Sequence, residues 1–319
     1  MRLPRFLTLM ILLLSTLVLN SCEKNPAGLE TPNIDVVAIR DLIASDPEVF
    51  SQIGVDDDGA QNPTYELGNL TKSEEQINTV KFGRKGKFQL ESVDVEFFGK
   101  PGEPDTLAIA TITRSFNGNF MVVEKDTNPA TPESLIVYKK DMANTLVRKV
   151  KFHRVANTPD PPKNWRRYEV SMEVCSSVPT TISVSEVKIV PPNSDAIVVT
   201  SPLDYFMDRD EGIPTFSQGD TVKVFVTLSN SNHYPPPPGT TVLLHYRCNH
   251  RFERARRPFN DAGLYPDVVA GDGIYSGYWI VRRPKGVFHA VIDVIDNGTI
   301  FDDVAPYNSV SWGTPYKVE

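Results

Sequence analysis

The chain has 319 residues, a formal net charge of −7 at pH 7 and an apolar content of 40%. This length predicts about two domains, and an acidic chain gives no general reason to expect nucleic acid as a partner. The 26 prolines and the ordinary apolar content together favour a loop-rich β protein.

The N-terminus has the charge and hydropathy pattern of a secretory leader. Arg2 and Arg5 precede an apolar run over 6–19 that only two threonines and one serine interrupt. At a helical rise of about 1.5 Å per residue, this run is too short to cross a hydrocarbon core of roughly 30 Å comfortably. It therefore predicts a signal peptide over 1–21, and removing that peptide changes the formal net charge from −7 to −9.

The leader ends in a cysteine. Leu19, Ser21 and Cys22 resemble the lipobox of bacterial lipoproteins, although Asn20 stands where a small or hydroxylated residue is usual. The resemblance implies that Cys22 is lipidated and that its acyl chains hold the protein in a membrane. Glu23 after the cysteine favours the outer membrane, facing the periplasm or the cell surface. The alternative is an ordinary signal peptide followed by a coincidental cysteine.

A tether and two helices are expected next. Residues 22–33 contain two prolines and a glycine without apolar periodicity, which predicts a flexible tether. Apolar residues then recur at three- and four-residue spacing, which predicts a helix from residue 34. Capping residues before Pro47 and an acid after it predict a second short helix that reaches residue 53.

From residue 89 the apolar period changes to two, which predicts strands. The expected strands cover 93–97, 106–114, 120–124, 146–154 and 168–174. Asn117-Gly118 lies between two of these strands and predicts a tight hairpin. Both central residues of such a turn need positive φ, and the Asn-Gly pair is favoured there for that reason. Helices followed by an antiparallel meander predict an α+β domain over 34–178.

This first domain resembles the NTF2-like (cystatin-related) cone folds. The resemblance rests on the opening helices, the strand over 148–154 and Asn164-Trp165-Arg166, and it covers 34–175. It implies a pocket between the helices and a curved sheet, where enzymes of that family place an aspartate–histidine or similar pair. His153 has no identifiable partner in the sequence, so no catalytic residue is expected.

A basic stretch lies within the predicted meander. Residues 139–167 hold nine Lys or Arg and two acids. Such a surplus can bind anionic headgroups or glycans. Because the charges alternate with apolar residues, the favoured interpretation is the solvated face of a sheet.

The second half of the chain predicts a β-sandwich domain over 179–319. The boundary is expected at 179–181, before a new series of strands. Val222, Val224, Val226 and Leu228 recur at a spacing of two and face one way, and about seven strands with regular turns favour two packed sheets.

An Asp/Gly-rich segment is the most distinctive pattern of this half. Asn260-Asp261-Ala262-Gly263 and the sequence of 270–275 resemble a motif of immunoglobulin-like (Ig-like) domains in bacterial secreted and surface proteins. The resemblance covers roughly 184–318 and implies a structural or binding module. Asp261, Asp267 and Asp272 predict either backbone hydrogen bonds within the turn or a Ca2+ site, because calcium prefers oxygen ligands.

The cysteines leave one possible disulfide. With Cys22 lipidated, Cys175 and Cys248 remain as a pair in an oxidising compartment. The two interpretations are a disulfide between them and two buried thiols, because sequence does not show whether their Cα atoms come within about 7 Å.

No enzyme motif stands out. Phosphate loops, His-Glu-x-x-His, Cys-x-x-Cys and Gly-x-Ser-x-Gly are all absent from the sequence. The leading hypothesis is a lipid-anchored envelope protein of the outer-membrane type, with a non-catalytic structural or binding role toward an envelope protein or glycan. The alternative is a small-molecule carrier or pocket enzyme that uses the first domain.

Overall fold

The protein is built almost entirely of strands. The computed structural model describes residues 33–45, 77, 79–102, 104–125, 134–208, 211–232, 234, 239–246, 255–282 and 285–319. Helical structure in these ranges consists of α2 (Ile34–Ala44), α3 (Asn297–Phe301) and the 3-10 turn η1 (Pro161–Asn164). Neither described α-helix has the length and apolar character needed to span a bilayer. The second helix predicted to reach residue 53 lies outside the described residues.

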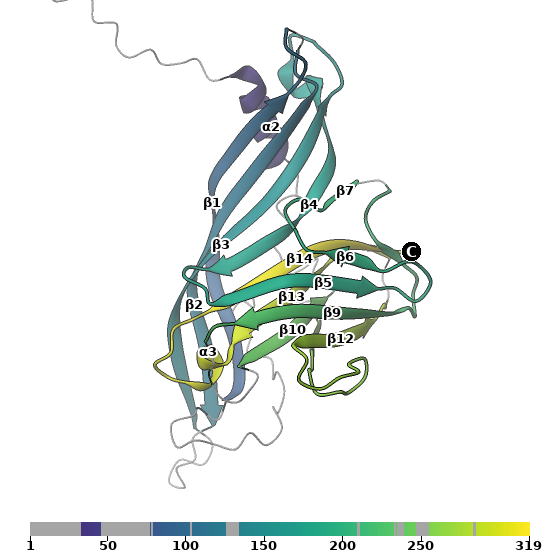
Figure 1. Ribbon diagram of the computed structural model, residues 1–319. Helices are drawn as coiled ribbons and strands as arrows, with labels where there is room; N and C mark the ends of the chain where they lie inside the picture. The colour runs from purple at the N-terminus through teal and green to yellow at the C-terminus, as the bar shows by residue number, and fades with distance from the viewer. Residues whose placement is uncertain are drawn as a thin grey trace, which may run out of the picture.

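One antiparallel meander forms the long axis of the molecule (Figure 1). It consists of β1 (Thr79–Phe98), β2 (Leu107–Lys125), β3 (Leu135–Arg154) and β4 (Trp165–Ser177). The same sheet continues from β4 through β14 (Ser309–Val318), β13 (Gly286–Asp296), β10 (Thr240–Tyr246) and β11 (Ala255–Pro258), with β7 (Phe206–Asp208) beside β4 and β8 (Thr215–Phe216) beside β14.

A second, smaller sheet faces the β14–β13–β10 part of the first. Its order is β12 (Ile274–Ile280), β9 (Thr221–Asn230), β5 (Ile182–Val190) and β6 (Ile197–Val199). Val222, Val224 and Val226 of β9 are buried, as their alternation predicts, in a core that also contains Trp279 and Trp312.

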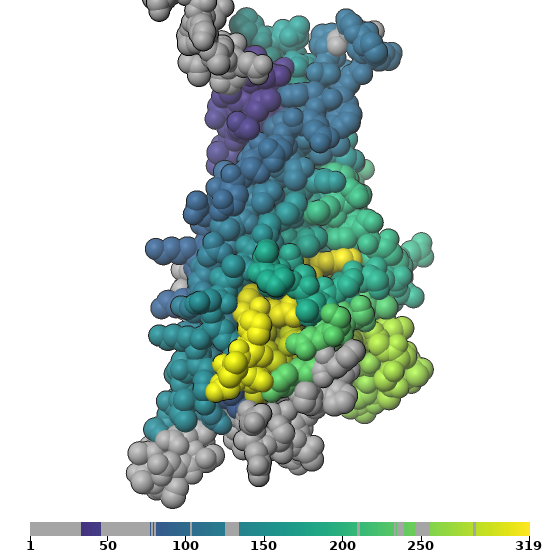
Figure 2. All heavy atoms as spheres, turned by 60° about the vertical axis from the view of Figure 1, so that its left-hand side comes forward, coloured from purple at the N-terminus to yellow at the C-terminus, as the bar shows by residue number. Residues whose placement is uncertain are grey.

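The long sheet curls so that its lower half covers the other face of β13 and β10. Phe82 of β1 and Phe120 of β2 share a second core with Leu243 and Val291. The neighbouring side chains on β10 and β13 point into the first core, so these two strands are buried on both faces. The space-filling view shows the yellow segment around α3 seated between the teal strands and the green strands (Figure 2).

The predicted α+β fold class of the first domain is wrong. The described part of that region contributes one eleven-residue α-helix, and the rest of its regular structure is the meander and a short 3-10 turn. Ile39 and Ile43 of α2 cover only a small third core against residues such as Ile112 and Phe152. Strands of the second half, rather than helices, cover the lower half of the meander, so the NTF2-like resemblance fails with the fold class.

The prediction of a hairpin at Asn117-Gly118 is also wrong, because β2 runs unbroken through this dipeptide. Gly118 pairs with Gly86 of β1 in the ladder. A Cβ at Gly118 would collide with the Lys85 carbonyl oxygen and the Gly86 backbone. Gly118 therefore allows the two strands to approach closely, which is a second common use of glycine in sheets.

Candidate functional site

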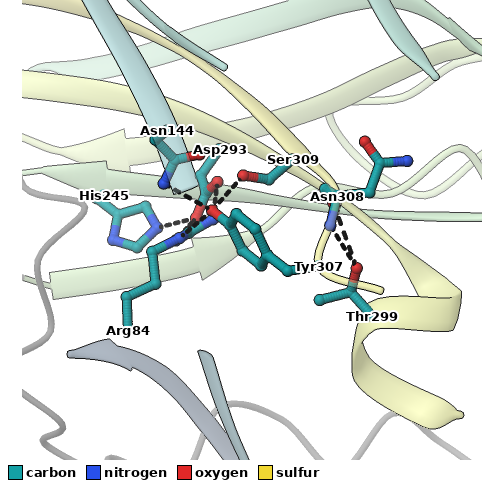
Figure 3. Close-up of polar contacts among 8 residues, drawn as sticks. All are labelled: Arg84, Asn144, His245, Asp293, Thr299, Tyr307, Asn308 and Ser309. Carbon is teal, nitrogen blue, oxygen red and sulfur yellow. Dashed lines mark hydrogen bonds and ion pairs between the residues drawn. The ribbon is translucent and has the colours of Figure 1, made fainter. Parts of the chain in front are cut away.

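A single carboxylate lies where the lower half of the meander packs against β13 and β10. Asp293 occupies β13 between apolar neighbours and is fully buried. Arg84 of β1 binds it through two parallel hydrogen bonds, from Nη1 to Oδ2 at 2.7 Å and from Nη2 to Oδ1 at 2.8 Å. His245 of β10 places Nε2 3.1 Å from Oδ2 of the same carboxylate (Figure 3). β1 thus meets β13 and β10, which lie far from it in the sheet order, at one charge.

The same guanidinium reaches the segment that precedes β14. Arg84 Nε donates to Tyr307 Oη at 2.8 Å, and Asn144 Nδ2 donates to the same oxygen at 3.2 Å. Tyr307 Oη also lies 2.5 Å from Ser309 Oγ. The Arg84 guanidinium stands 5.8 Å from the Phe120 ring centroid, within the range of a cation–π contact.

Electrostatics keep both members of the pair ionised. Burial opposes each charge, because it lowers the pKa of Arg84 and raises that of Asp293. Their mutual attraction outweighs burial, so the pKa of Arg84 lies well above its usual value and that of Asp293 well below. Burial also raises the pKa of Tyr307, which remains a neutral phenol at physiological pH.

This network contains the residue types of a nucleophilic triad without the geometry. In such a triad a serine hydroxyl contacts the histidine that an aspartate orients. Here the Ser309 hydroxyl contacts Tyr307, and Asp293 is held by Arg84 as well as by His245. All five residues are nearly or fully inaccessible to solvent. We conclude that the network joins the layers of the fold.

A second buried cluster lies between the second and third cores. Glu173 Oε2 of β4 is 2.5 Å from Arg114 Nη2 and 3.4 Å from Arg148 Nε. The pKa of Arg148 is lowered mainly by burial, with nearby Arg114 and Arg167 adding to the effect and Glu173 opposing it. Arg148 therefore does not lie on a solvated face, contrary to the interpretation of the basic stretch.

Lys140 is the other exception within that stretch. Its ammonium donates to the carbonyl oxygens of Gly298, Asp302 and Ala305 at 3.0, 2.5 and 2.6 Å. Burial lowers the pKa of Lys140 to about 8. This lysine thus fastens the α3 segment to the meander, whereas Lys149 and Lys151 keep partly exposed positions.

The structure brings Asp261, Asp267 and Asp272 together. One carboxylate oxygen from each lies within 4.8 Å of the others. Asp261 accepts three backbone amides of 271–273 at 2.8–3.1 Å, and Asp267 accepts two amides of its own loop at 2.6 and 2.8 Å. These bonds fit the structural interpretation, and the grouping of oxygens fits a hard cation. Calcium binding remains a hypothesis.

These bonds fix a loop that exposes apolar side chains. The aspartate loop (residues 261–273) connects to β12 at the lower end of the molecule, away from α2 (Figure 1). Four of its large apolar side chains are 55–83% exposed: Leu264, Tyr265, Val268 and Val269. The Tyr265 ring lies 5.5 Å from Tyr278, and Lys223 Nζ lies 5.2 Å from its centroid. Large exposed apolar groups held on one loop make it the candidate interaction surface.

The remaining predicted residues are only partly covered by the structure. Cys22 and Cys248 lie outside the described residues, so lipidation and the disulfide stay predictions. Cys175 is buried, and burial raises the pKa of its thiol to about 12. His153 stacks on Tyr168 with ring centroids 3.5 Å apart.

Sequence analysis missed the Arg84–Asp293 network, although one signal was present. Asp293 interrupts an apolar run over 291–295. A lone carboxylate in a strand that is apolar on both faces needs a buried partner. Nothing in the sequence identifies Arg84 as that partner. Comparisons with known protein families and with curated protein sequences gave no match.

Proposed function

We propose that this protein is a lipid-anchored component of a bacterial cell envelope with a non-catalytic binding role. The leader and Cys22 support the anchor, and the aspartate loop supports the binding role. The loop carries the proposal, because its exposed aliphatic and aromatic side chains are held in place before any partner arrives. Burying one such side chain fully is worth about 1.5–3 kcal/mol.

The chemistry of the loop favours a protein partner. Leu264, Val268 and Val269 offer aliphatic surface for an apolar pocket, and Tyr265 adds the residue type that is enriched at interface centres. Lys223 beside Tyr265 supplies a positive charge at the rim. The buried ion pairs of the body add rigidity and present no reactive group to solvent.

Site-specific photo-cross-linking in the native host tests the binding role. A photoreactive residue replaces Val268 in one strain and Val304 in another, since Val304 is 85% exposed in the separate segment after α3. We expect a discrete adduct of defined mass from position 268 and none from position 304. Identical adducts from both positions, or none from either, would contradict a binding role for the loop.

The anchor is tested separately. Labelled palmitate should be incorporated by the wild-type chain and not by Cys22→Ser, and the variant should leave the membrane fraction. Incorporation that is unchanged in the variant would place the lipid elsewhere.

A further inference from the structure

Exposed apolar side chains also gather at the opposite end of the molecule from the aspartate loop. Ile34 and Val37 of α2, Phe98 at the end of β1 and Val155 after β3 are 41–63% exposed. Ile34 and Val37 are three residues apart and therefore lie on one side of the helix. We call this region, with α2 and the adjoining ends of β1 to β4, the α2 end (Figure 1).

Hydrogen bonds hold the parts of the α2 end together. Thr106 N donates to the Phe98 carbonyl at 3.0 Å, and Arg154 N donates to the Thr106 carbonyl at 2.9 Å. The Arg154 guanidinium then binds Asp35 of α2, with Nη2 2.5 Å from Oδ2. Phe98, the start of α2 and Arg154, which precedes Val155, are thus joined by one set of contacts that holds these segments in place relative to one another.

We propose that the α2 end rests on the lipid bilayer, with these four apolar side chains at the membrane surface. The inference rests on the proposed lipid at Cys22. The tether from that residue leads directly into Asn33, which caps α2. The region nearest to the anchor is therefore also a region with apolar groups for the membrane interface.

The reach of the tether opposes the inverted orientation. Eleven residues lead from Cys22 to Asn33, and a chain of that length spans at most about 40 Å. The twenty residues of β1 extend about 65 Å. If the lower end of β1 stood on the bilayer, α2 would lie beyond the reach of its own anchor. With the α2 end on the bilayer, the aspartate loop points away from the membrane.

Two cations of the α2 end are paired with acids, so we expect apolar contact to carry the interaction. Exposed Lys163 is paired with Asp160 at 2.8 Å, and Arg154 is paired with Asp35. Exposed Lys100 lies near exposed Glu96 in the sequence. We therefore expect the contact to form on neutral phosphatidylcholine as well as on anionic lipid.

A fluorescent probe tests the orientation in the processed, lipidated protein. Val155→Cys and Val304→Cys are each combined with Cys248→Ser and labelled with an environment-sensitive dye, since Cys175 is buried. The proteins are reconstituted into phosphatidylcholine vesicles that contain a spin-labelled lipid. We expect a blue-shifted emission and lipid-dependent quenching at position 155, and neither at position 304. Phe98→Cys should reproduce the result at a second position.

Each other outcome overturns the orientation. Unquenched emission at position 155 in vesicle-bound protein would mean that the α2 end stands clear of the bilayer. Equal quenching at positions 155 and 304 would mean that the molecule lies flat. A blue shift without lipid quenching would assign the surface to a contact between protein copies. Palmitate incorporation, measured on the same samples, shows independently whether the anchor itself is present.

Discussion

Removing the charge of Asp293 should strongly destabilise the protein. Asp293→Asn keeps the shape of the side chain but leaves the Arg84 guanidinium buried beside a neutral amide. Breaking a buried ion pair by removing one partner costs about 3–5 kcal/mol of unfolding free energy. Urea denaturation followed by tryptophan fluorescence measures this loss. Asp303→Asn is the matched control, because Asp303 is exposed and its substitution should change the free energy by less than about 0.5 kcal/mol.

The pH dependence gives the same prediction a second readout. The pKa of Asp293 lies below its usual value, so the unfolded chain takes up this proton at a higher pH than the folded protein does. The carboxylate therefore stabilises the fold above about pH 4, its ordinary pKa, and this contribution is lost as the pH falls further. Asp293→Asn should reduce the slope of stability against pH in that acidic range, relative to wild type and to Asp303→Asn.

Replacing both members of the pair tests whether the lost stability comes from leaving one buried charge without its partner. Arg84→Met with Asp293→Leu removes both charges and keeps apolar volume in the core. We expect the double variant to be more stable than either single variant, because apolar replacement of a buried pair is often neutral or better. Asp293→Asn with unfolding free energy within about 0.5 kcal/mol of wild type, and an unchanged acid slope, would refute the reasoning.

Three further predictions concern single sites. Gly118→Ala should lose about 1–3 kcal/mol in urea denaturation, because its Cβ meets the Lys85 carbonyl; wild-type stability would contradict the close approach. If backbone amides alone close the loop, Asp261→Ala should lose about 0.5–1.5 kcal/mol of unfolding free energy, equally in calcium and in chelator. If calcium raises the melting temperature of the wild-type protein, the aspartate cluster binds an ion. Cys175 should resist alkylation in native protein at pH 8 and should react in denaturant without reductant. If Cys175 reacts in denaturant only after reductant is added, the thiol is held in a disulfide. Mass spectrometry of linked peptides would then establish Cys248 as its partner.

Local patterns predicted some of the local elements. The three- and four-residue spacing after residue 33 predicted the helix observed over Ile34–Ala44. The alternation of Val222, Val224 and Val226 predicted which face of β9 is buried. In both cases a single element carries the whole signal, because burial of one face imposes the period.

Long-range pairing was not predictable in the same way. Arg84 and Asp293 are 209 residues apart, and only the curl of the long sheet brings them together. Lys140 and Arg148 lie in register with Met142, Leu146 and Val150 on the buried face of β3, whereas Lys149 and Lys151 lie on its other face. A period of two identifies the two faces of a strand and does not tell which face, or whether both, will be covered.

The buried pair offers a physical reason for keeping charge in the interior. A slip of β1 by one residue along β2 would turn Arg84 toward solvent and leave Asp293 buried without its arginine partner. The cost of removing that partner, about 3–5 kcal/mol, penalises the slipped register far more than apolar contacts alone would. The hypothesis is that the pair specifies the register of β1 on its neighbour β2. If so, the stable Arg84→Met, Asp293→Leu variant should show extra amide resonances for β1 residues in two-dimensional spectra, and a single set of resonances would reject this role.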